Sequence, residues 1–445
     1  MSKSQTTNGH QEPAPFNIAI IGSGLVGLPI ALGLIHRNIP VTIYEQTHAL
    51  KEIGAGIGIS GSGKACLNFL DPKLAETLET VANKSPTGYQ CIDGFSQEDV
   101  RLRPKDKLFD MVYDTPGGGS YLCHRAQLLA AMIDLVSPDR LKLGKRVDTI
   151  TRGEDNEKMV IKFCDGTSAE ADGVIGCDGI KSRVRQIIAG IDNPASYPRY
   201  AHESAYRCLV DMDEAFPVLG HLAKRQILFA GHGAHIMAYP VADFKYLNVA
   251  AFVRDSGDWP HDQKHTVSAN KDDIVDSFSR FGPYVRDLVK LLPDELNRWG
   301  TFDTLDHPLS SFTNGRITLA GDAAHGTTPH LGYGAGMGIE DATVLIAVLE
   351  QAAMVLKKGD RGISKEDALV HAFETYDSVH RERAQWLVRI SRRQGELVKW
   401  EVPEIGGDWD GIYKDMDERI PPLLLFDWEG MIRQATDEFT RRIHS

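Results

Sequence analysis

The sequence predicts an α/β fold that combines a domain of parallel strands and helices, an inserted β-sheet domain and a set of C-terminal helices. Three observations support this prediction. Residues 16–35 are uncharged and split at their glycines into a β-branched half and a helical half, as expected for a strand, a turn and a helix. Residues 191–290 contain three runs rich in β-branched and aromatic residues. Residues 368–397 have helical character.

The first glycine-rich turn reads Gly22-Ser-Gly24-Leu-Val-Gly27, and the next strand ends at Glu45. In a dinucleotide-binding turn the first glycine permits the turn, the second lets the backbone approach a pyrophosphate, and the third lets the helix pack on the strand. The helix N-terminus attracts phosphate, and the distant acid accepts ribose hydroxyls. The pattern predicts a Rossmann-like dinucleotide site, with a turn that serves packing alone as the alternative. It does not separate NAD from FAD, because both contain ADP.

Three more motifs follow the first turn, and no second fingerprint occurs. Leu122-Cys-His-Arg125 precedes a predicted helix, and Asp178-Gly179 ends a predicted strand. The stretch GDAAHGTTPHLGYGAGMGIEDA, residues 321–342, follows the predicted strand 317–320. Together with the fingerprint and Glu45, these motifs resemble those of single-component flavin aromatic hydroxylases, the salicylate and p-hydroxybenzoate hydroxylase type. The resemblance covers about residues 16–395.

The resemblance implies a p-hydroxybenzoate hydroxylase-like domain that binds FAD tightly but non-covalently. Arg125 would contact the ribityl and phosphate region, Asp178 would help position FAD and the nicotinamide nucleotide, and Asp322 would bond the ribityl chain. Gly58, Ala335 and Gly336 would present backbone to the cofactor. The alternatives are a surface helix that begins at Arg125, an ordinary Asp-Gly turn at residue 178 and a simple helix N-cap at Asp322.

A metal site is the main competing interpretation of residues 321–342, and we predict none. His325 and His330 lie in a glycine-rich segment that is not expected to form one helix, so their spacing defines no common face. No cysteine joins them, and no HExxH motif appears. We expect His325 to be packed or hydrogen-bonded, and Glu340 and Asp341 to be structural.

The middle segment resembles a narrower group, the fungal enzymes that oxidatively dearomatise polyketide phenols, such as methylorcinaldehyde, sorbicillin-type and azaphilone-forming monooxygenases. The resemblance rests on residues 204–207, 233–241 and 248–253. It implies that Arg207 and Tyr239 hold the substrate as a phenolate. His235 would help to remove the proton or bind a carbonyl, with a satisfied strand histidine as the alternative.

The chemistry agrees with this assignment. Hydroxylation by a flavin C4a-hydroperoxide is electrophilic, so the ring carbon must be electron-rich. A phenol has a pKa of about 10, which a cation and a hydrogen-bond donor lower. Arg207 supplies the permanent charge and Tyr239 the donor.

The sequence therefore predicts an FAD-dependent monooxygenase that dearomatises a resorcinol aldehyde or ketone of polyketide origin, using O2 and either NADPH or NADH as a transient reductant. The alternatives are ordinary ortho- or decarboxylative hydroxylation of a salicylate-like phenol, and a non-catalytic flavoprotein sensor. Product analysis separates the first two.

Composition and charge limit the partners. The net charge of −12 and the lack of basic blocks argue against nucleic acid. A polar segment before residue 16 and six scattered cysteines favour a cytoplasmic protein without a membrane span. The expected domains are a disordered segment 1–15, an FAD-binding domain, a substrate domain and a C-terminal helical region (365–445) with a possible homodimer contact. The FAD-binding domain takes residues 16–80, 105–190 and 291–360, and the substrate domain takes residues 81–104 and 191–290.

Overall fold

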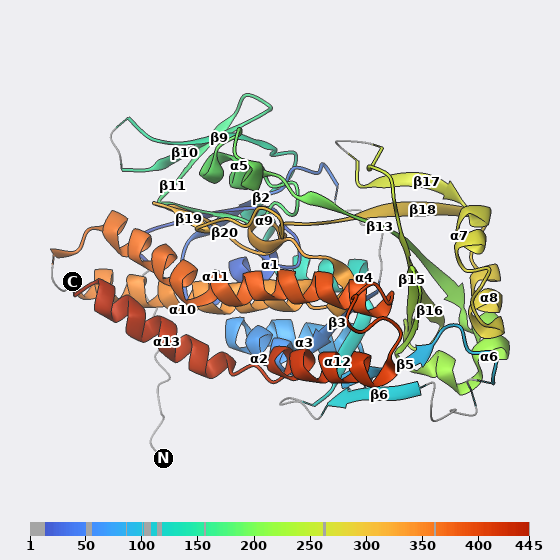
Figure 1. Ribbon diagram of the computed structural model, residues 1–445. Coiled ribbons are helices and arrows are strands. Elements are labelled where there is room, and N and C mark those ends of the chain that lie inside the picture. Colours follow the sequence, from blue (N-terminus) through green and yellow to red (C-terminus); the bar gives the residue numbers. More distant parts are fainter. Residues whose placement is uncertain are drawn as a thin grey trace, which may run out of the picture.

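The computed structural model describes residues 14–49, 56–85, 87–99, 101, 108–113, 118–154, 157–260, 264–359 and 362–444. The predicted disordered segment 1–15 lies almost entirely outside these residues. The described part forms the predicted α/β fold, with a parallel sheet, a larger and mostly antiparallel sheet and a layer of long helices (Figure 1).

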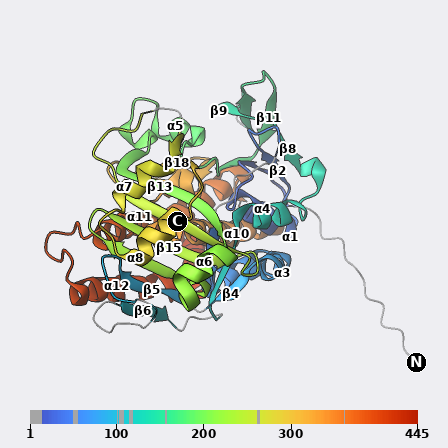
Figure 2. The same ribbon diagram turned by 90° about the vertical axis from the view of Figure 1, so that its right-hand side faces the viewer.

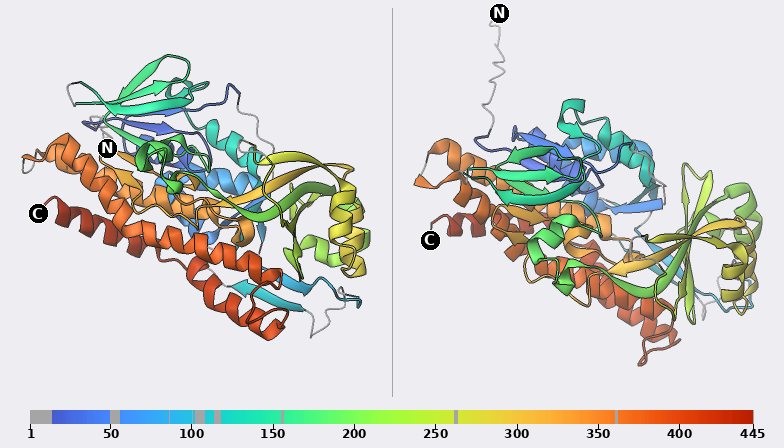
Figure 3. Two further views of the ribbon diagram at one scale, coloured as in Figure 1. Left: turned by 45° about the horizontal axis from the view of Figure 1, so that its top comes forward. Right: turned by 90° about the horizontal axis from the view of Figure 1, so that it is seen from above.

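The parallel sheet is the centre of the first domain. Its strand β1 (Ile18–Ile21) is completely buried, because helix α1 (Gly27–His36) packs on one face and a small antiparallel sheet covers the other (Figure 3). The remaining strands of the parallel sheet are β2 (Val41–Tyr44), β8 (Leu141–Lys142), β12 (Gly173–Gly176), β20 (Ile317–Leu319) and an antiparallel edge strand β19 (Thr313–Asn314). The covering sheet contains β9 (Val147–Arg152), β10 (Met159–Phe163) and β11 (Ser168–Ala171).

Three long helices run side by side along the molecule (Figure 1). They are α10 (Gly334–Lys358), α11 (Lys365–Val398) and α13 (Trp428–Arg442). Residues 336–349 of α10 are all buried, the charged Glu340 and Asp341 included, so this helix crosses the interior of the first domain. The other helices of this part are α2 (Gly61–Leu70), α3 (Pro72–Val81), α4 (Arg125–Ile133), α5 (Arg183–Ala189), α9 (Asp322–His325) and α12 (Trp409–Leu424).

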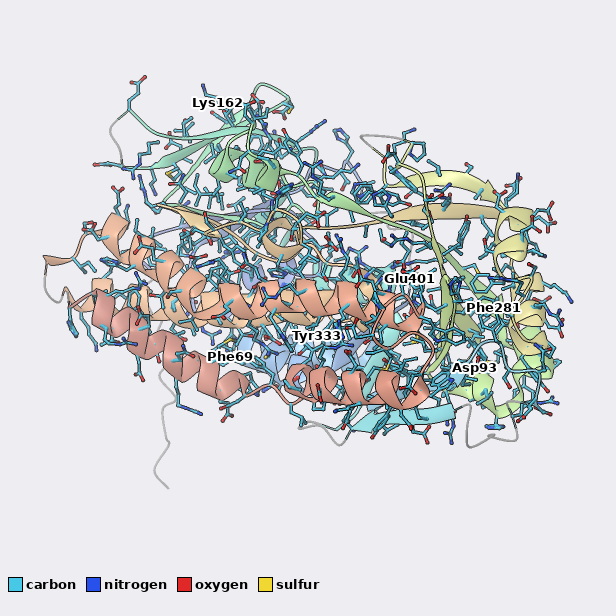
Figure 4. The ribbon with its side chains drawn as sticks, in the orientation of Figure 1. Phe69, Asp93, Lys162, Phe281, Tyr333 and Glu401 are labelled. Atoms are coloured by element: carbon cyan, nitrogen blue, oxygen red, sulfur yellow. The ribbon has the colours of Figure 1, made fainter. Side chains whose placement is uncertain are left out.

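The second sheet has eight strands and two different faces. Its outer face packs on three helices through a hydrophobic core that includes Phe281 (Figures 2 and 4). The first domain has a separate hydrophobic core, to which Tyr333 belongs (Figure 4). The three helices are α6 (Met212–Leu219), α7 (Lys271–Ser277) and α8 (Pro283–Lys290). In sheet order the strands are β17 (Thr266–Asn270), β18 (Glu295–Asp303), β13 (Arg199–Asp211), β16 (Tyr246–Arg254), β15 (Ala234–Val241), β14 (Ile227–Gly231), β5 (Thr87–Asp93) and β6 (Leu108–Tyr113).

A third small sheet lies where the two domains meet. Strand β7 (Ser120–His124) runs between β3 (Gly56–Ser60) and β4 (Asn83–Ser85), and it leads directly into α4. This sheet brings Gly56 within hydrogen-bond distance of the eight-stranded sheet, because its N–H donates to Asn248 Oδ1 at 3.0 Å.

Several sequence predictions can be compared with this fold. The strand, turn and helix of residues 16–35, the β-rich middle segment and the C-terminal helices are present. The eight-stranded sheet also includes β6 and β18, which lie in ranges that we had given to the FAD-binding domain. All six cysteines are free, and Cys164 is exposed. Within the described residues, no helix has the length and apolar character that crossing a membrane requires.

Candidate active site

One cavity of about 580 Å³ lies between the two domains. Its first wall, the loop wall, consists of the loops that follow β1, β12 and β20 and the first turn of α10. These loops leave the carboxyl ends of neighbouring parallel strands, the usual ligand position in an open α/β sheet. Its second wall, the sheet wall, is the inner face of the eight-stranded sheet. A ligand in this cavity therefore meets backbone turns on one side and strand side chains on the other.

The first turn has the geometry that the glycine pattern predicts. Gly22 has a φ of +103°, and a Cβ there would lie 2.4 Å from the Cys177 carbonyl oxygen. A Cβ on Gly27 would lie 2.1 Å from the carbonyl oxygen of Gly22, so the helix can start this close to the strand only with glycine. Gly24 differs from both, because no protein atom lies within 4 Å of its ideal Cβ, and it lines the cavity. The turn thus leaves room for a ligand at Gly24.

Glu45 lies at the end of β2, where its carboxylate is already hydrogen-bonded. Oε2 accepts from the backbone N–H and the hydroxyl of Ser23, each at 2.9 Å, and Oε1 accepts from the N–H of Thr47 at 2.9 Å. The acid therefore fixes the glycine turn, and its bond to a ribose stays a prediction.

The carboxylate of Asp178 is hydrogen-bonded within its own turn, and its expected role in positioning the cofactor stays a prediction. Its Oδ2 accepts from the N–H groups of Arg183 and Val184 at 2.7 and 3.1 Å, and the hydroxyl of Ser182 donates to Oδ1. These bonds hold the carboxylate at the start of α5, and the cavity is lined by its neighbours Cys177 and Gly179 instead. Asp178 shapes the turn because local N–H groups compete successfully for its oxygens.

Asp322 faces the cavity together with Arg125. The carboxylate belongs to the first residue of α9 and makes no cap bond, since Gly321 occupies the N-cap position. The N-cap alternative for Asp322 is therefore wrong. The Asp322 side chain is exposed to the cavity. Desolvation by the protein around the cavity raises the pKa of its carboxyl, while the charges of His325 and Arg125 oppose that rise. Arg125 begins α4 and lines the same cavity, so an acceptor and a cation are both directed at the ligand.

A buried network supports the loop that carries Asp322. Asp341 of α10 accepts from the N–H of Gly321 at 2.7 Å and from the Tyr376 hydroxyl at 3.0 Å. Its Oδ2 lies 2.6 Å from His325 Nε2, and His380 Nε2 lies 3.0 Å from its Oδ1. Despite burial, His325 holds the pKa of Asp341 below its ordinary value, and Asp341 raises the pKa of His325. His325 is hydrogen-bonded and Asp341 is structural, as the sequence predicted.

The remaining glycine-rich positions divide into two groups. Gly58 and Ala335 line the cavity, as expected. Gly336 does not, because it is buried and a Cβ there would lie 3.1 Å from the ring of Tyr333. Gly336 thus has a packing role, and its expected cofactor contact stays a prediction. The N-terminus of α10 still faces the cavity through Gly334 and Ala335, whose N–H groups have no partner within the helix.

Arg207, Tyr239 and His235 share the inner face of the eight-stranded sheet. Arg207 and Met237 are both paired with Ala250 in the strand register, and Tyr239 and His235 each lie two residues from Met237 along β15. Side chains two residues apart point to the same face of a strand. All three predicted residues line the cavity.

Arg207 is a partly buried cation with unsatisfied hydrogen-bonding capacity. Among the described residues it forms no ion pair with a carboxylate, and its Nε has no hydrogen-bond partner. Burial lowers the pKa of Arg207, with Tyr239 opposing the shift, and burial raises the pKa of Tyr239. A partly buried cation without a partner is costly, so this arrangement calls for an anionic ligand.

Two residues that the sequence did not single out hold Tyr239 in place. A Cβ on Gly56 would lie 2.5 Å from the Tyr239 hydroxyl, so only glycine allows this close approach. Asn248 is paired with Tyr239 in the strand register and fixes the N–H of Gly56. Gly56 lies 192 residues from Asn248 in the chain, and no local pattern could reveal that contact.

His235 and His330 belong to a buried charged cluster. His330 Nε2 lies 2.9 Å from Glu203 Oε1, and Lys399 pairs with the other oxygen of Glu203. His235 stacks on Phe252 with ring centroids 4.6 Å apart. Burial and the neighbouring His330 lower the pKa of His235 well below its ordinary value, so the imidazole is neutral.

The same cluster contains the one arrangement in the described residues with metal-ligand proximity. Donor atoms of Glu203, His235 and His330 lie within 4.8 Å of one another. The carboxylate of Glu203 is already neutralised by Lys399, whose ammonium would repel a cation. The two histidines that raised the question of a metal are separated, since His325 bonds Asp341 and His330 lies against Glu203.

The loop wall fits a flavin dinucleotide in its donors, acceptors and free space. Gly24 has space for a pyrophosphate, Arg125 supplies a cation for phosphate, and Asp322 supplies an acceptor for hydroxyls. The start of α10 supplies N–H groups for a polar ring edge.

Comparisons with known proteins give the same assignment. The sequence model of a FAD binding domain matches residues 136–389. The FAD-dependent monooxygenase pigN of Monascus ruber is 42% identical over 97% of this chain and 99% of the relative. The salicylate hydroxylase asL1 of Sarocladium schorii is 35% identical over 97% of this chain and 92% of the relative. A solved salicylate hydroxylase substrate complex has a TM-score of 0.79 at 27% identity, covering 95% of this chain and 98% of that chain.

Proposed function

The chain belongs to the single-component FAD-dependent aromatic hydroxylases, and we propose that it hydroxylates a phenol that Arg207 holds as the phenolate. It is an FAD-dependent monooxygenase. The proposal adds the substrate class, the use of NADPH or NADH as the reductant, and dearomatisation of the ring. The observation that carries it is the partly buried guanidinium of Arg207, which has no carboxylate partner among the described residues and faces the same cavity as Tyr239.

The phenolate is the reactive form of such a substrate. A phenol in water has a pKa of about 10, and a cation within a few ångströms favours its ionised form. Arg207 remains protonated at neutral pH, and its charge is weakly screened because it is partly buried. Tyr239 donates a hydrogen bond to the same oxygen. The neutral His235 lines the same cavity, and its Nδ1, which has no hydrogen-bond partner within the protein, can hydrogen-bond the substrate.

FAD, held by Asp322, Arg125 and the turn at Gly24, would supply an electrophilic oxygen atom from O2 after reduction by NAD(P)H. One atom of O2 enters the product and the other leaves as water, while NAD(P)H provides two electrons. If the attacked ring carbon bears a hydrogen, that hydrogen is lost and a catechol forms. If it bears an alkyl group, aromaticity cannot return and a hydroxy-dienone remains. The sheet wall keeps water from the oxygen-transfer step.

A salicylate-type substrate is the second candidate. Arg207 suits a carboxylate as well as a phenolate, because a guanidinium binds either anion. The similarity to asL1 and to the solved salicylate hydroxylase favours this candidate. Its products would be catechols, with loss of CO2 where the ring carbon that bears the carboxylate is attacked.

The test is a panel of resorcinol aldehydes and ketones, with salicylate included, incubated with the FAD-loaded enzyme and NADPH or NADH. We expect substrate-dependent oxidation of the reductant, a product heavier by one oxygen atom, and a dienone absorption for substrates alkylated at the attacked carbon. Catechol products from those substrates would contradict dearomatisation. Reductant oxidation that does not depend on any phenol would contradict the hydroxylase itself.

A further inference from the structure

The cavity continues beyond the phenolate site, across the strands of the sheet wall. Arg207 of β13, Ala250 of β16, Met237 of β15 and Leu228 of β14 form one row in the strand register. Neighbouring strands lie about 4.8 Å apart, so the row spans roughly 14 Å from Arg207 to Leu228. Leu228 lines the same cavity as Arg207. The space is therefore longer in this direction than one aromatic ring requires.

The far end of the row is an apolar chamber. It is closed by strand β6 and by helix α12, which packs over this end of the sheet. Several of its side chains stay partly accessible although protein surrounds them, because they face the cavity. We define the apolar chamber by Met111, Leu228, Met237, Leu331, Ile420 and Leu424.

The two ends of the row differ in chemistry. Near Arg207 the sheet wall carries small residues, Ala205 and Ala250, which leave space for a flat ring. The apolar chamber carries no charged side chain. The hydroxyl of Tyr89, which also lines the cavity, already accepts a hydrogen bond from Gln394 at 3.3 Å. A ligand that fills both ends must be anionic at one end and apolar at the other.

We propose that the substrate is a phenol with an extended apolar chain, and that the apolar chamber binds this chain while Arg207 binds the phenolate. The inference rests on the proposed function and narrows its substrate class. Anchoring both ends would fix which ring carbon faces the cofactor, because a phenol held only by its oxygen could rotate about that contact.

A homologous series of 2,4-dihydroxyphenyl alkyl ketones, from acetyl to decanoyl, tests this directly. Burial of one methylene contributes about 0.8 kcal/mol, or nearly fourfold in binding. We therefore expect the Kd for the FAD-loaded enzyme, followed by the change in flavin absorbance, to fall severalfold per methylene until the chamber is full. We expect kcat/KM to rise in parallel.

Matched substitutions test where the alkyl chain of the ligand binds. Leu228→Phe adds bulk inside the apolar chamber, and Leu424→Phe does so from α12, which provides a second variant if the first folds poorly. Val112→Phe is the control, because Val112 follows Met111 in the chain but is 54% exposed. We expect the decanoyl-to-acetyl ratio of affinities to fall at least tenfold in the two chamber variants and to stay unchanged in the control.

The outcomes separate the two proposals. The proposed role of the apolar chamber is wrong if Kd does not depend on the length of the alkyl chain. It is also wrong if the decanoyl-to-acetyl ratio of affinities stays unchanged in both chamber variants. Neither outcome depends on whether the acetyl ketone is hydroxylated. Chain-dependent binding without any hydroxylation overturns the proposed function and leaves the chamber supported.

Discussion

The two walls of the cavity are built by different physical means. The loop wall uses backbone: Gly22 and Gly27 allow turns that no other residue permits, and only Asp322 and Arg125 contribute charged side chains to the cavity. The sheet wall uses side chains, with Arg207, Tyr239 and His235 projecting from one face of neighbouring strands. A wall of backbone can bind the same group in many proteins, whereas a wall of strand side chains can change its ligand by single substitutions.

The charges of the two walls are also balanced differently. In the loop wall, Asp341 pairs with His325, and the network stays closed without a ligand. In the sheet wall, Arg207 has no carboxylate partner among the described residues. The loop wall is thus preorganised by the protein itself, and the sheet wall is completed by its substrate.

The first prediction separates the walls by removing that unpaired charge. Arg207→Gln should lower kcat/KM for a phenol by at least a hundredfold, since truncating one partner of a buried charged pair costs about 2–5 kcal/mol. Because the bound phenol would lose the cation that lowers its pKa, the remaining activity should shift to higher pH. FAD occupancy, read from the absorbance spectrum, should not change. The control is Arg199→Gln, an exposed arginine on the same strand; equal losses in both variants would contradict the phenolate role.

The same contrast explains how far the sequence could be interpreted. The glycine turn, Glu45 and the Asp322 motif are contiguous patterns, so the loop wall could be predicted residue by residue. For two residues the structure adds a local role that the patterns do not reveal: Asp178 accepts from N–H groups at the start of α5, and Gly336 packs on Tyr333.

The sheet wall could be predicted only where a family resemblance pointed to Arg207 and Tyr239. The contact of Gly56 with Tyr239 and the row from Arg207 to Leu228 depend on strand register. A one-residue slip in register would turn every side chain to the other face. No composition or spacing fixes that register between segments this far apart.

The second prediction concerns the network that supports the loop wall. Asp341→Asn should lower the free energy of unfolding by about 3 kcal/mol, because it leaves buried partners without their charge. The pKa of Asp341 is lowered in the folded protein. Its contribution to the free energy of unfolding is therefore complete above the ordinary pKa of 3.8 and is lost as the pH falls through the pKa of the folded state. The pKa of His325 is raised in the folded protein. Its contribution to the free energy of unfolding is therefore complete below the ordinary pKa of 6.5 and is lost as the pH rises through the pKa of the folded state. The difference between variant and wild type should be largest between these limits.

Urea unfolding at several pH values measures this difference. The control is Glu374→Gln, which removes a half-exposed pair with Arg442 on the surface of α11 and should cost less than about 1 kcal/mol. A destabilisation by Asp341→Asn that is the same at pH 5.5 and pH 9 would show that the charge of His325 takes no part.

The third prediction uses one methyl group on each wall. Gly24→Ala places a Cβ where no protein atom lies within 4 Å, so the apoprotein should keep its Tm. The methyl would instead meet the bound cofactor and weaken FAD binding by fivefold or more, since overpacking costs about 1–3 kcal/mol. Gly56→Ala places its Cβ 2.5 Å from the Tyr239 hydroxyl. It should therefore raise KM for the phenol by a similar factor and leave FAD affinity unchanged.

Each variant serves as the control for the other, because both make the same chemical change. The measurements are FAD titration of the apoprotein and the steady-state KM of the FAD-loaded enzyme. If Gly24→Ala changed KM for the phenol and left FAD affinity intact, or Gly56→Ala did the reverse, the division of labour between the walls would be wrong. We expect Gly24→Ala to change only FAD affinity and Gly56→Ala to change only KM for the phenol. That result would mean that backbone space at Gly24 selects the cofactor, while the position of the Tyr239 side chain selects the substrate.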